Sequence, residues 1–420
     1  MKNLIIWLAI CIFLLALLPR LLVAFAPHPA LFSDMEDYDR TAVNFLRGHG
    51  LVMSPEYRAY RPPGYPLFLV FLYTLAGRNF LVVRIVQAVL SGGSCVLLFV
   101  LARSLLAEDR RRWVQIGVPV VAGAALALSK THALFSGILL TETLFTFLLL
   151  VFAVILCGAS PCGRMFRFAA PVLLGVLSLI RPIAALYLPA LLVADACVAT
   201  GDSDTPGWTI VLKRSVLKVS LFLLPLVPWT IRNAVVLHAF VPLSTNAGVN
   251  FYIGHHPGYS YWSTGAKETI RSQTDLDEVA ENRLFFRIGL DYILHHPGQT
   301  VADTVRKAVY LLRPGITPWP ANEPVYNLKF PLIPGIRTIL VQWNWIFLIL
   351  FPIGAVLAWR SLPRSRPIHV LVVCHIAATL CYFARSRFRL PLEPFFLLWI
   401  AFAIMHGAGT AVRLMRKEAK

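Results

Sequence analysis

LIIWLAICIFLLALLPRLLVAF, residues 4–25, is an apolar stretch whose only charged residue is Arg20. An apolar run of about 18 or more residues can cross a bilayer as a helix. In hydrocarbon a helix satisfies its own backbone hydrogen bonds, which an open strand cannot do. Similar runs occur at Leu81–Leu101 and Trp343–Ala358. The sequence therefore predicts an all-α, polytopic membrane protein.

The first apolar run is interpreted as a spanning helix rather than a signal peptide. Lys2 precedes it, as a basic residue precedes the apolar core of a signal. The run is longer than a typical signal core, and it lacks a small-x-small cleavage site.

The composition agrees with a membrane-embedded chain. Of its 420 residues, 57% are hydrophobic and 14% charged, against roughly 45–50% and 25% in soluble domains. The formal charge of +18 would suggest nucleic-acid binding in a soluble protein, but membrane topology explains the basic residues, so no nucleic acid is expected. We expect a single membrane domain over 1–420, in contact with membrane lipids.

Basic residues in the short connections predict the orientation of the helices, because Lys and Arg concentrate in cytoplasmic loops. Placing the connections around Arg103–Arg112, Arg164–Arg167, Lys213–Arg214 and Arg360–Arg366 inside puts both termini in the cytoplasm. This alternation requires about ten spans. They are expected at 3–25, 80–102, 113–130, 136–157, 166–180, 183–199, 215–236, 338–358, 367–384 and 390–411.

Two long external segments follow from this alternation, at 26–79 and 237–336. The first contains an apolar segment, 62–77, that is expected to lie on the outer surface, because a span there would reverse every later loop. It also contains an amphipathic helix in which Tyr38, Ala42, Phe45 and Leu46 share one face. Two further amphipathic helices are expected near 278–295 and 300–312, as juxtamembrane elements.

The first external segment carries an acidic cluster, SDMEDYD, at residues 33–39. Acidic residues in a first helical turn suit the helix dipole, which is one explanation. A carboxylate beside the membrane surface can also remove a proton from an acceptor hydroxyl or amine. Asp34 is the candidate for that role, with Glu36 and Asp37 beside it.

Basic side chains on the external face indicate an anionic ligand. Arg61 precedes two prolines, and Arg385, Arg387 and Arg389 form a second cluster. The planar guanidinium suits phosphate, although contact with lipid head groups is an alternative. Two more polar groups are expected at outer helix ends, Glu142 and Arg181, because a charge inside the membrane is costly and usually functional.

A metal or other cofactor is not expected. The seven cysteines lie outside the two long polar segments and show no metal-type spacing. The pairs His255-His256 and His295-His296 precede Pro-Gly, but no carboxylate or cysteine pattern completes a site. A divalent cation stays an open alternative that nothing in the sequence indicates.

The stretch from Asp34 to Leu67 resembles the first external loop of the bacterial GT-C glycosyltransferases (family 39) that are related to protein O-mannosyltransferases and to the lipid A aminoarabinose transferase. The shared pattern is an Asp four residues before a Tyr, a short helix ending in Gly-x-Gly, and Arg/Lys-Pro-Pro with an aromatic helix. Here these are Asp34 and Tyr38, Gly48-His49-Gly50, and RPPGYP at 61–66, which includes Tyr65. The aminoarabinose transferase has Lys in place of Arg61, and its Glu directly follows the Asp, whereas Met35 intervenes here.

Weaker similarities to this family continue along most of the chain, in the same order. They are LTE at 140–142, LIRP at 179–182, PWTIRN at 228–233, PLSTN at 242–246 and RFRLPL at 387–392.

The resemblance implies a multi-pass inner-membrane enzyme of bacteria with an extracytoplasmic active site. It would transfer one sugar from a polyprenyl-phosphate donor to a lipid, glycan or protein acceptor, inverting the anomeric centre by direct displacement. Asp34 would be the catalytic base. The remaining substrate-binding candidates are Glu36, Asp37, Tyr38, Arg61, Tyr65, Glu142, Arg181, Asn246, Arg385, Arg387 and Arg389.

A transporter or flippase for an anionic phospholipid or glycolipid is the main alternative. It would also use buried acids and external arginines. It predicts paired broken helices in mid-membrane and repeat symmetry, and no internal repeat is visible in the sequence. A structural scaffold, the third alternative, leaves Glu142 and the external arginines unexplained.

Overall fold

A computed structural model describes residues 2–26, 28, 30–109, 111–158, 166–199, 208–260, 270–271, 275–313 and 345–418. Within these ranges the regular elements are helices, and no strand occurs. The helices of the membrane region are α1 (Lys2–Phe25), α4 (Phe80–Leu105), α5 (Arg112–Ala127), α6 (Lys130–Ser136), α7 (Thr141–Leu156), α8 (Phe166–Ile180), η1 (Pro182–Tyr187), α9 (Leu188–Ala199), α10 (Trp208–Leu223), α11 (Leu226–Leu237), α17 (Trp345–Ser361), η3 (Pro363–Ser365), α18 (Arg366–Cys381), η4 (Ser386–Leu392) and α19 (Glu393–Glu418).

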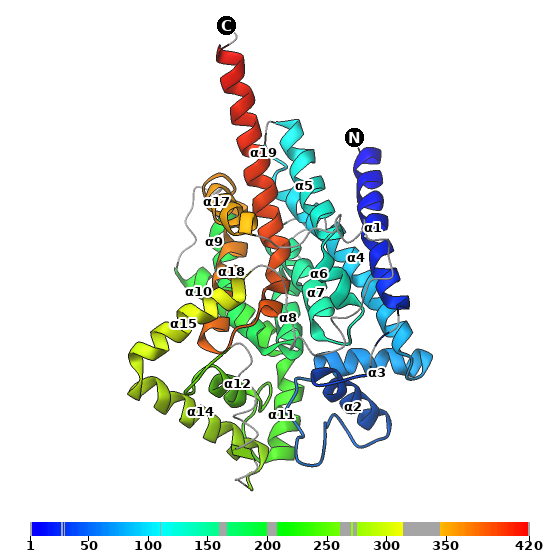
Figure 1. The fold of residues 1–420 in the computed structure, drawn as a ribbon, viewed down its shortest axis with the longest axis vertical. Coiled ribbons are helices and arrows are strands. Elements are labelled where there is room, and N and C mark those ends of the chain that lie inside the picture. The colour runs from blue at the N-terminus through cyan, green and yellow to red at the C-terminus, as the bar shows by residue number, and fades with distance from the viewer. Residues whose placement is uncertain are drawn as a thin grey trace.

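Five further helices belong to the two segments predicted to be external, 26–79 and 237–336: α2 (Asp34–Leu46), α3 (Gly64–Ala76), α12 (Ala247–Ile253), α14 (Glu278–His295) and α15 (Pro297–Leu312). They lie at the end of the molecule opposite to both chain termini (Figure 1). In the same view α3 runs across the lower ends of α1 and α4.

The described helices meet the requirements of a multi-pass membrane protein. Three of them are long and apolar enough to cross a bilayer, at Lys2–Phe25, Phe80–Leu105 and Ser386–Gly407, or five if each of two bent pairs is one span. Five shorter apolar helices accompany them, α3 among them. All ten predicted spans coincide with a helix or a broken pair, although residues 338–344 of one span lie outside the described residues.

Two of the predicted spans are each broken into two helices, so the prediction that they are continuous was wrong. The span predicted at 136–157 is α6 and α7, which meet at an angle of 115°. Gln87 satisfies the freed backbone at this break by donating from Nε2 to the carbonyls of Ser136 and Ile138. The span predicted at 215–236 is α10 and α11, bent by 52°. Pro225 stands at the start of α11, where its missing N–H and its ring interrupt the helical bonding.

A fully buried arginine joins three of the membrane helices. Arg20 of α1 donates from Nη1 to Ala127 O at 2.8 Å and from Nη2 to Leu126 O at 3.1 Å, at the end of α5. Its Nε donates to Ser91 Oγ of α4 at 2.7 Å. A cation at a helix C-terminus is stabilised by the free carbonyls and the dipole, which accounts for the only charge in the first apolar run.

The amphipathic helix predicted around 38–47 exists as α2 but begins at Asp34. Of the four residues predicted to share one face, Tyr38 and Ala42 are buried, whereas Phe45 and Leu46 near the end of the helix are exposed. The helix ends before Gly48 and Gly50, whose φ angles of +83° and +82° favour glycine. Helices α14 and α15 match the other two amphipathic predictions within three residues.

Candidate active site

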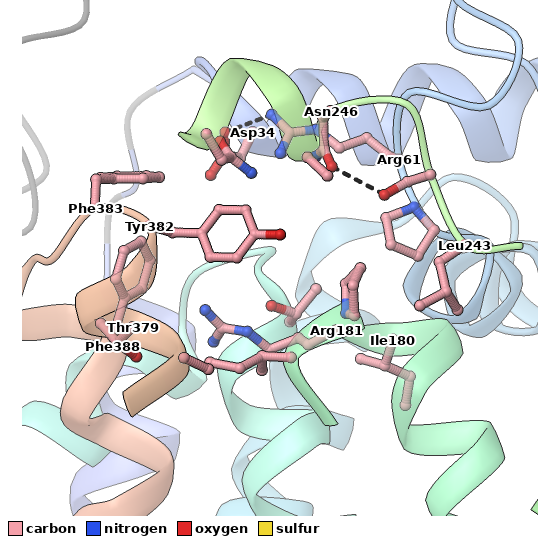
Figure 2. Close-up of a pocket in the computed structure, with 18 of the residues that line it drawn as sticks. Asp34, Arg61, Ile180, Arg181, Leu243, Asn246, Thr379, Tyr382, Phe383 and Phe388 are labelled. Atoms are coloured by element: carbon pink, nitrogen blue, oxygen red, sulfur yellow. Dashed lines mark hydrogen bonds and ion pairs between the residues drawn. The ribbon is translucent and has the colours of Figure 1, made fainter. Parts of the chain in front are cut away.

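A cavity of about 600 Å³ lies where α2, the N-terminus of α7, η1, α12 and η4 converge (Figure 2). Eight of the twelve predicted site residues line it. They are Asp34, Tyr38, Arg61, Glu142, Arg181, Asn246, Arg385 and Arg387. Positions more than 350 residues apart in sequence therefore share one cavity.

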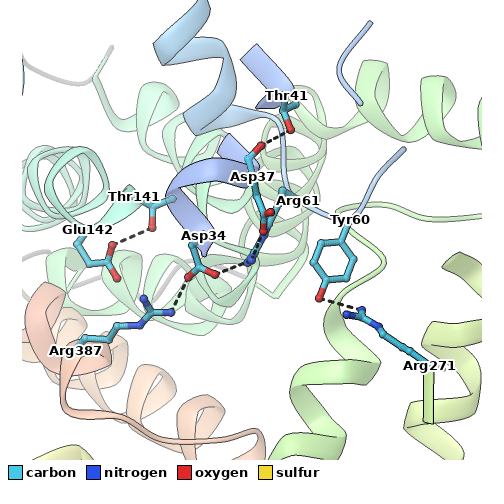
Figure 3. A network of polar contacts seen from close by, with 9 residues as sticks. All are labelled: Asp34, Asp37, Thr41, Tyr60, Arg61, Thr141, Glu142, Arg271 and Arg387. Atoms are coloured by element: carbon cyan, nitrogen blue, oxygen red, sulfur yellow. Dashed lines mark hydrogen bonds and ion pairs between the residues drawn. The ribbon is translucent and has the colours of Figure 1, made fainter. Parts of the chain in front are cut away.

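Asp34 sits between two arginines at the N-terminus of α2 (Figure 3). Its Oδ1 accepts from Arg61 Nη2 at 2.7 Å and its Oδ2 from Arg387 Nη2 at 2.8 Å. Burial would raise the pKa of this carboxyl, but the charges of Arg61 and Arg387 outweigh burial and hold the pKa well below its usual range. Asp34 is therefore an anion at neutral pH, fixed by contacts from both sides.

The backbone just before Asp34 is strained. Ser33 has a φ of 51° and makes no side-chain capping bond to α2, although Asp34, Glu36 and Asp37 do occupy the first turn. A non-glycine residue in such a conformation costs on the order of 1–3 kcal/mol, and such residues cluster at functional sites. Helix-dipole compensation alone does not explain this segment, because Asp34 faces two arginines.

Arg61 is held by carboxylates and aromatic rings together. Its Nε and Nη2 donate to Asp37 Oδ2 at 3.1 and 2.8 Å, beside the bond to Asp34. Its guanidinium lies 5.6 Å from the ring centroid of Tyr38 and 5.2 Å from that of Tyr60. Burial raises the pKa of Tyr38 to about 12, so its hydroxyl stays protonated and can donate.

A second acid–base pair lines the same cavity. Arg181 Nη1 lies 3.5 Å from Glu142 Oε1, and the side chain of Glu142 is only 3% exposed. The guanidinium of Arg181 also lies within 6 Å of the ring centroids of Phe145 and Phe388. In Figure 2, Arg181 lies across the cavity from Asp34 and Arg61, with Tyr382 between them.

The charges of the lining favour an anion. The described lining contains Arg61, Arg181, Arg385 and Arg387 against Asp34 and Glu142, which is four positive charges minus two negative ones, or +2. Asn246 is held in place by Ser244, whose Oγ donates to its Oδ1 at 2.9 Å. A phosphate would find guanidinium groups on more than one wall.

The other four predicted residues lie elsewhere. Tyr65 is fully buried and donates to Gln87 Oε1. Arg389 donates from Nε to Glu393 Oε1 and from Nη1 to Leu311 O and Arg313 O. Neither of these two residues lines the main cavity, and their hydrogen bonds join helices to one another.

Glu36 and Asp37, the remaining two, line a smaller neighbouring cavity of about 250 Å³. This second cavity shares Ser33, Asp34, Tyr60 and Arg61 with the first.

Three groups that shape the site, His375, Tyr60 and Arg271, were not among the predicted site residues. His375 of α18 lines the main cavity, accepts from the Tyr187 hydroxyl and donates from Nε2 to Phe388 O at 2.9 Å. A histidine in an apolar helix carries no usable signal, and α18 contains two, His369 and His375. Tyr60 could have been found from its position next to Arg61, whereas Arg271 stands in no motif.

The described residues contain no group of three or more His, Cys, Asp or Glu side chains that could hold a metal ion. His255 Nε2 lies 3.1 Å from Lys307 Nζ, and its Nδ1 contacts the Phe251 carbonyl.

No family model and no curated protein sequence match the chain. Among solved structures it is similar to ArnT from Cupriavidus metallidurans bound to undecaprenyl phosphate, with 15% identity and a TM-score of 0.43 over 95% of this chain and 78% of that one. The apo state of the same protein gives 15% identity and 0.41 over 94% and 76%. The Archaeoglobus fulgidus oligosaccharyltransferase, tethered to an acceptor peptide, gives 13% and 0.49 over 94% of this chain and 49% of that one.

ArnT, the lipid A aminoarabinose transferase, and the oligosaccharyltransferase are both GT-C glycosyltransferases, the group that the sequence motifs resemble. The TM-scores lie below 0.5, so the chemistry of the site rests on the residues of the chain itself.

Proposed function

We propose that the chain is an inverting membrane glycosyltransferase of the bacterial inner membrane. It transfers a sugar from a polyprenyl-phosphate donor to an acceptor on the extracytoplasmic face. The observation that carries the proposal is the Asp34 carboxylate, held between Arg61 and Arg387 in a cavity lined by four arginines. A positioned base and several phosphate-binding groups meet at one point.

Direct displacement needs few groups when the donor already carries phosphate. The acceptor oxygen forms a bond to the anomeric carbon, the bond from that carbon to the phosphate oxygen breaks, and the acceptor proton passes to Asp34. The donor phosphodiester has one negative charge, and the released phosphomonoester gains a second. Arginines that are already in place stabilise this added charge in the transition state, so no acid is required.

The low pKa of Asp34 in the free protein is compatible with its role as a base, because a bound phosphate would raise that pKa. A phosphate among the arginines competes for the guanidinium groups of Arg61 and Arg387, and it places a like charge near the carboxylate. Both effects raise the pKa of Asp34. The base therefore becomes stronger when the donor is bound.

The apolar part of the main cavity suits the beginning of a prenyl chain. Ile183 and Leu186 of η1 and Ala378 of α18 line it together with Phe383. Leu186 is 49% exposed, and η1 lies between two helices of the membrane region. A lipid tail can leave the cavity along this side into the bilayer.

A flippase or transporter of an anionic lipid is the second candidate, since the two bent helix pairs match one of its expected features. The pairs differ in angle, however, at 115° and 52°, and they follow no repeat in the sequence. The alternatives differ in product, because a transferase adds a sugar and a flippase leaves its lipid unchanged.

Binding of undecaprenyl phosphate to the purified full-length protein tests the donor site. Arg61→Ala and Arg387→Ala should each weaken binding at least tenfold. Arg78→Ala is the matched control, because Arg78 also pairs with an aspartate, Asp39, at 2.7 Å but lies outside both cavities. Equal affinity in all three variants would remove the phosphate assignment.

A strain that carries Asp34→Asn in the chromosome tests transfer itself. Mass spectrometry of its envelope glycolipids, glycans and glycoproteins should show a product that lacks one sugar, as in a deletion strain. An unchanged product that accumulates on the cytoplasmic side would indicate a flippase instead.

A further inference from the structure

The smaller cavity beside the main one has its own set of residues. In addition to the four shared residues, Glu36, Asp37, Met53, Tyr57 and Arg271 line it. Its volume of about 250 Å³ lies below the roughly 300–1,000 Å³ of sites for drug-sized ligands. It has room for one ring-sized group.

Hydrogen bonds fix the outer wall of this cavity. Tyr57 donates its hydroxyl to Glu281 Oε2 at 2.8 Å, and Arg271 Nη2 donates to Glu281 Oε1 at 2.7 Å and to the Tyr60 hydroxyl at 3.3 Å. Glu281 of α14 is itself buried. Figure 3 shows Arg271 reaching Tyr60 from the side opposite to Asp34. The wall is thus in place before any ligand arrives, which reduces the entropic cost of binding.

The lining differs chemically from that of the main cavity. It contains three carboxylates, Asp34, Glu36 and Asp37, against Arg61 and Arg271, so the balance is −1 where the main cavity has +2. Within the described part of the chain, the exposed Glu36 carboxylate has no hydrogen-bond or ion-pair partner. Met53 is the one aliphatic side chain among the described lining residues.

These groups suit a neutral, hydroxyl-rich ring. Each sugar hydroxyl both donates and accepts, so it matches a wall that offers carboxylates, tyrosine hydroxyls, a serine and an arginine. A second phosphate would be repelled by the net negative charge, and a prenyl chain would leave the polar groups desolvated and unsatisfied.

The geometry of displacement places the acceptor here. Inversion requires the attacking oxygen and the leaving phosphate to lie on opposite sides of the anomeric carbon. The phosphate belongs with the arginines of the main cavity, and Asp34 borders both cavities. A group in the smaller cavity can therefore present its hydroxyl to the Asp34 carboxylate.

On these grounds, and resting on the proposed function, we propose that the smaller cavity binds the acceptor and that the acceptor is a neutral sugar residue of a glycan. Glu36 and Asp37 accept hydrogen bonds from its hydroxyls, and Tyr57 and Arg271 form the wall against which the ring is held. Acceptors that carry a carboxylate on this ring are rejected.

Saturation-transfer NMR on the full-length protein in nanodiscs tests the proposal. The probes are methyl α-glucoside, methyl α-galactoside, methyl α-mannoside, methyl α-glucuronide and N-acetyl-threonine amide. At least one neutral glycoside should bind saturably, and the glucuronide at least tenfold more weakly than its glucose counterpart. Glu36→Gln and Tyr57→Phe should each weaken binding of the neutral glycoside severalfold. Glu36→Gln should also reduce the difference in affinity between the glucoside and the glucuronide.

Two substitutions serve as matched controls: Glu56→Gln, at an exposed position next to Tyr57, and Asp291→Asn, on the exposed face of α14. Both should leave glycoside binding unchanged. Undecaprenyl phosphate, titrated in parallel, should bind Glu36→Gln as tightly as the wild type.

The two proposals fail separately in this experiment. If undecaprenyl phosphate binds but no neutral glycoside does, or if glucuronide binds as well as glucoside, the acceptor assignment is overturned and the donor site stands. Binding of the threonine amide in place of the glycosides overturns it in favour of a protein acceptor. If a glycoside binds in a manner sensitive to Glu36 while undecaprenyl phosphate does not bind, the sugar subsite stands and the proposed donor is wrong.

Discussion

Arg387 donates a hydrogen bond to Asp34 at 2.8 Å although 353 positions separate the two residues. The bond joins η4, next to the last membrane helix, to the start of α2 in the first external segment. Each residue is placed by its own surroundings, since His375 holds the neighbouring Phe388 carbonyl and Arg61 holds the other oxygen of Asp34. The site therefore depends on the packing of the whole helical assembly.

Asp34→Asn should lower transfer by roughly the 10²–10⁴-fold of a lost general base, because the amide keeps the size of the side chain but cannot take a proton. Initial rates with a polyprenyl-phosphate sugar measure this effect. Glu36→Gln should cost less and should act mainly on KM for the acceptor. The roles are reversed if Asp34→Asn is near wild type while Glu36→Gln is inactive.

The paired state of Asp34 should appear in the pH dependence of stability. Its pKa is depressed in the folded protein, so its contribution is fully present above the unfolded value of about 3.9. The contribution is lost as the pH falls toward the folded pKa. Thermal unfolding in detergent should thus show a Tm gap between wild type and Asp34→Asn that is constant from pH 8 to 6 and shrinks below about pH 4. A gap that widens in acid would contradict the depressed pKa.

Glu278 should be a structural anchor of the site. Its carboxylate accepts from Arg58 N at 2.8 Å, from Ala59 N at 3.2 Å and from Thr245 Oγ1 at 2.7 Å. Glu278→Ala leaves these donors unsatisfied. Each unsatisfied donor lowers the free energy of unfolding by about 1–3 kcal/mol where no water replaces the carboxylate. We expect a lower Tm and weaker undecaprenyl phosphate binding, because Arg61 follows this segment.

Asp291→Ala, at an exposed position of the same helix, is the control for Glu278→Ala and should change neither quantity. If the two variants behave alike, Glu278 has no anchoring role.

Topology can be tested by cysteine labelling in a background that lacks the native cysteines. Arg283→Cys on α14 should react with a membrane-impermeant maleimide in cells with a permeabilised outer membrane, whereas Arg112→Cys at the start of α5 should not. Both positions are exposed, so access depends on the side of the membrane alone. Labelling of Arg112→Cys without labelling of Arg283→Cys would invert the orientation.

The long apolar runs of the sequence predicted the fold well, because a helix across hydrocarbon must be apolar over most of its length. The breaks were missed for a related reason. Residues 136–140 are as apolar as a helix requires, and the distant Gln87 satisfies the backbone at the bend by donating to Ser136 O and Ile138 O. No local pattern around 136–140 predicts that Gln87 will bond there.

The site was predicted where charge stood out against an apolar background, as at Asp34, Glu142 and Arg181. The same criterion also selected Arg389, two positions after Arg387, whose side chain is directed at Glu393 and two carbonyls outside the main cavity. The direction in which a side chain points changes from one residue of a short 3₁₀ helix to the next, and it depends on tertiary packing. Arg271 was missed because its role arises only when α14 places Glu281 beside Tyr57.

The division of the site into two cavities that share Ser33, Asp34, Tyr60 and Arg61 has an evolutionary consequence. Under the proposed assignments, substitutions at Glu36, Tyr57 or Arg271 would alter the choice of acceptor while the arginines of the main cavity stay as they are. Under the same assignments, changes at Arg181 or Arg385 would alter the fit to the donor lipid without disturbing the acceptor. The shared residues are those at which a mutation affects both substrates at once, so a lineage could change acceptors stepwise while Asp34 and Arg61 stayed fixed.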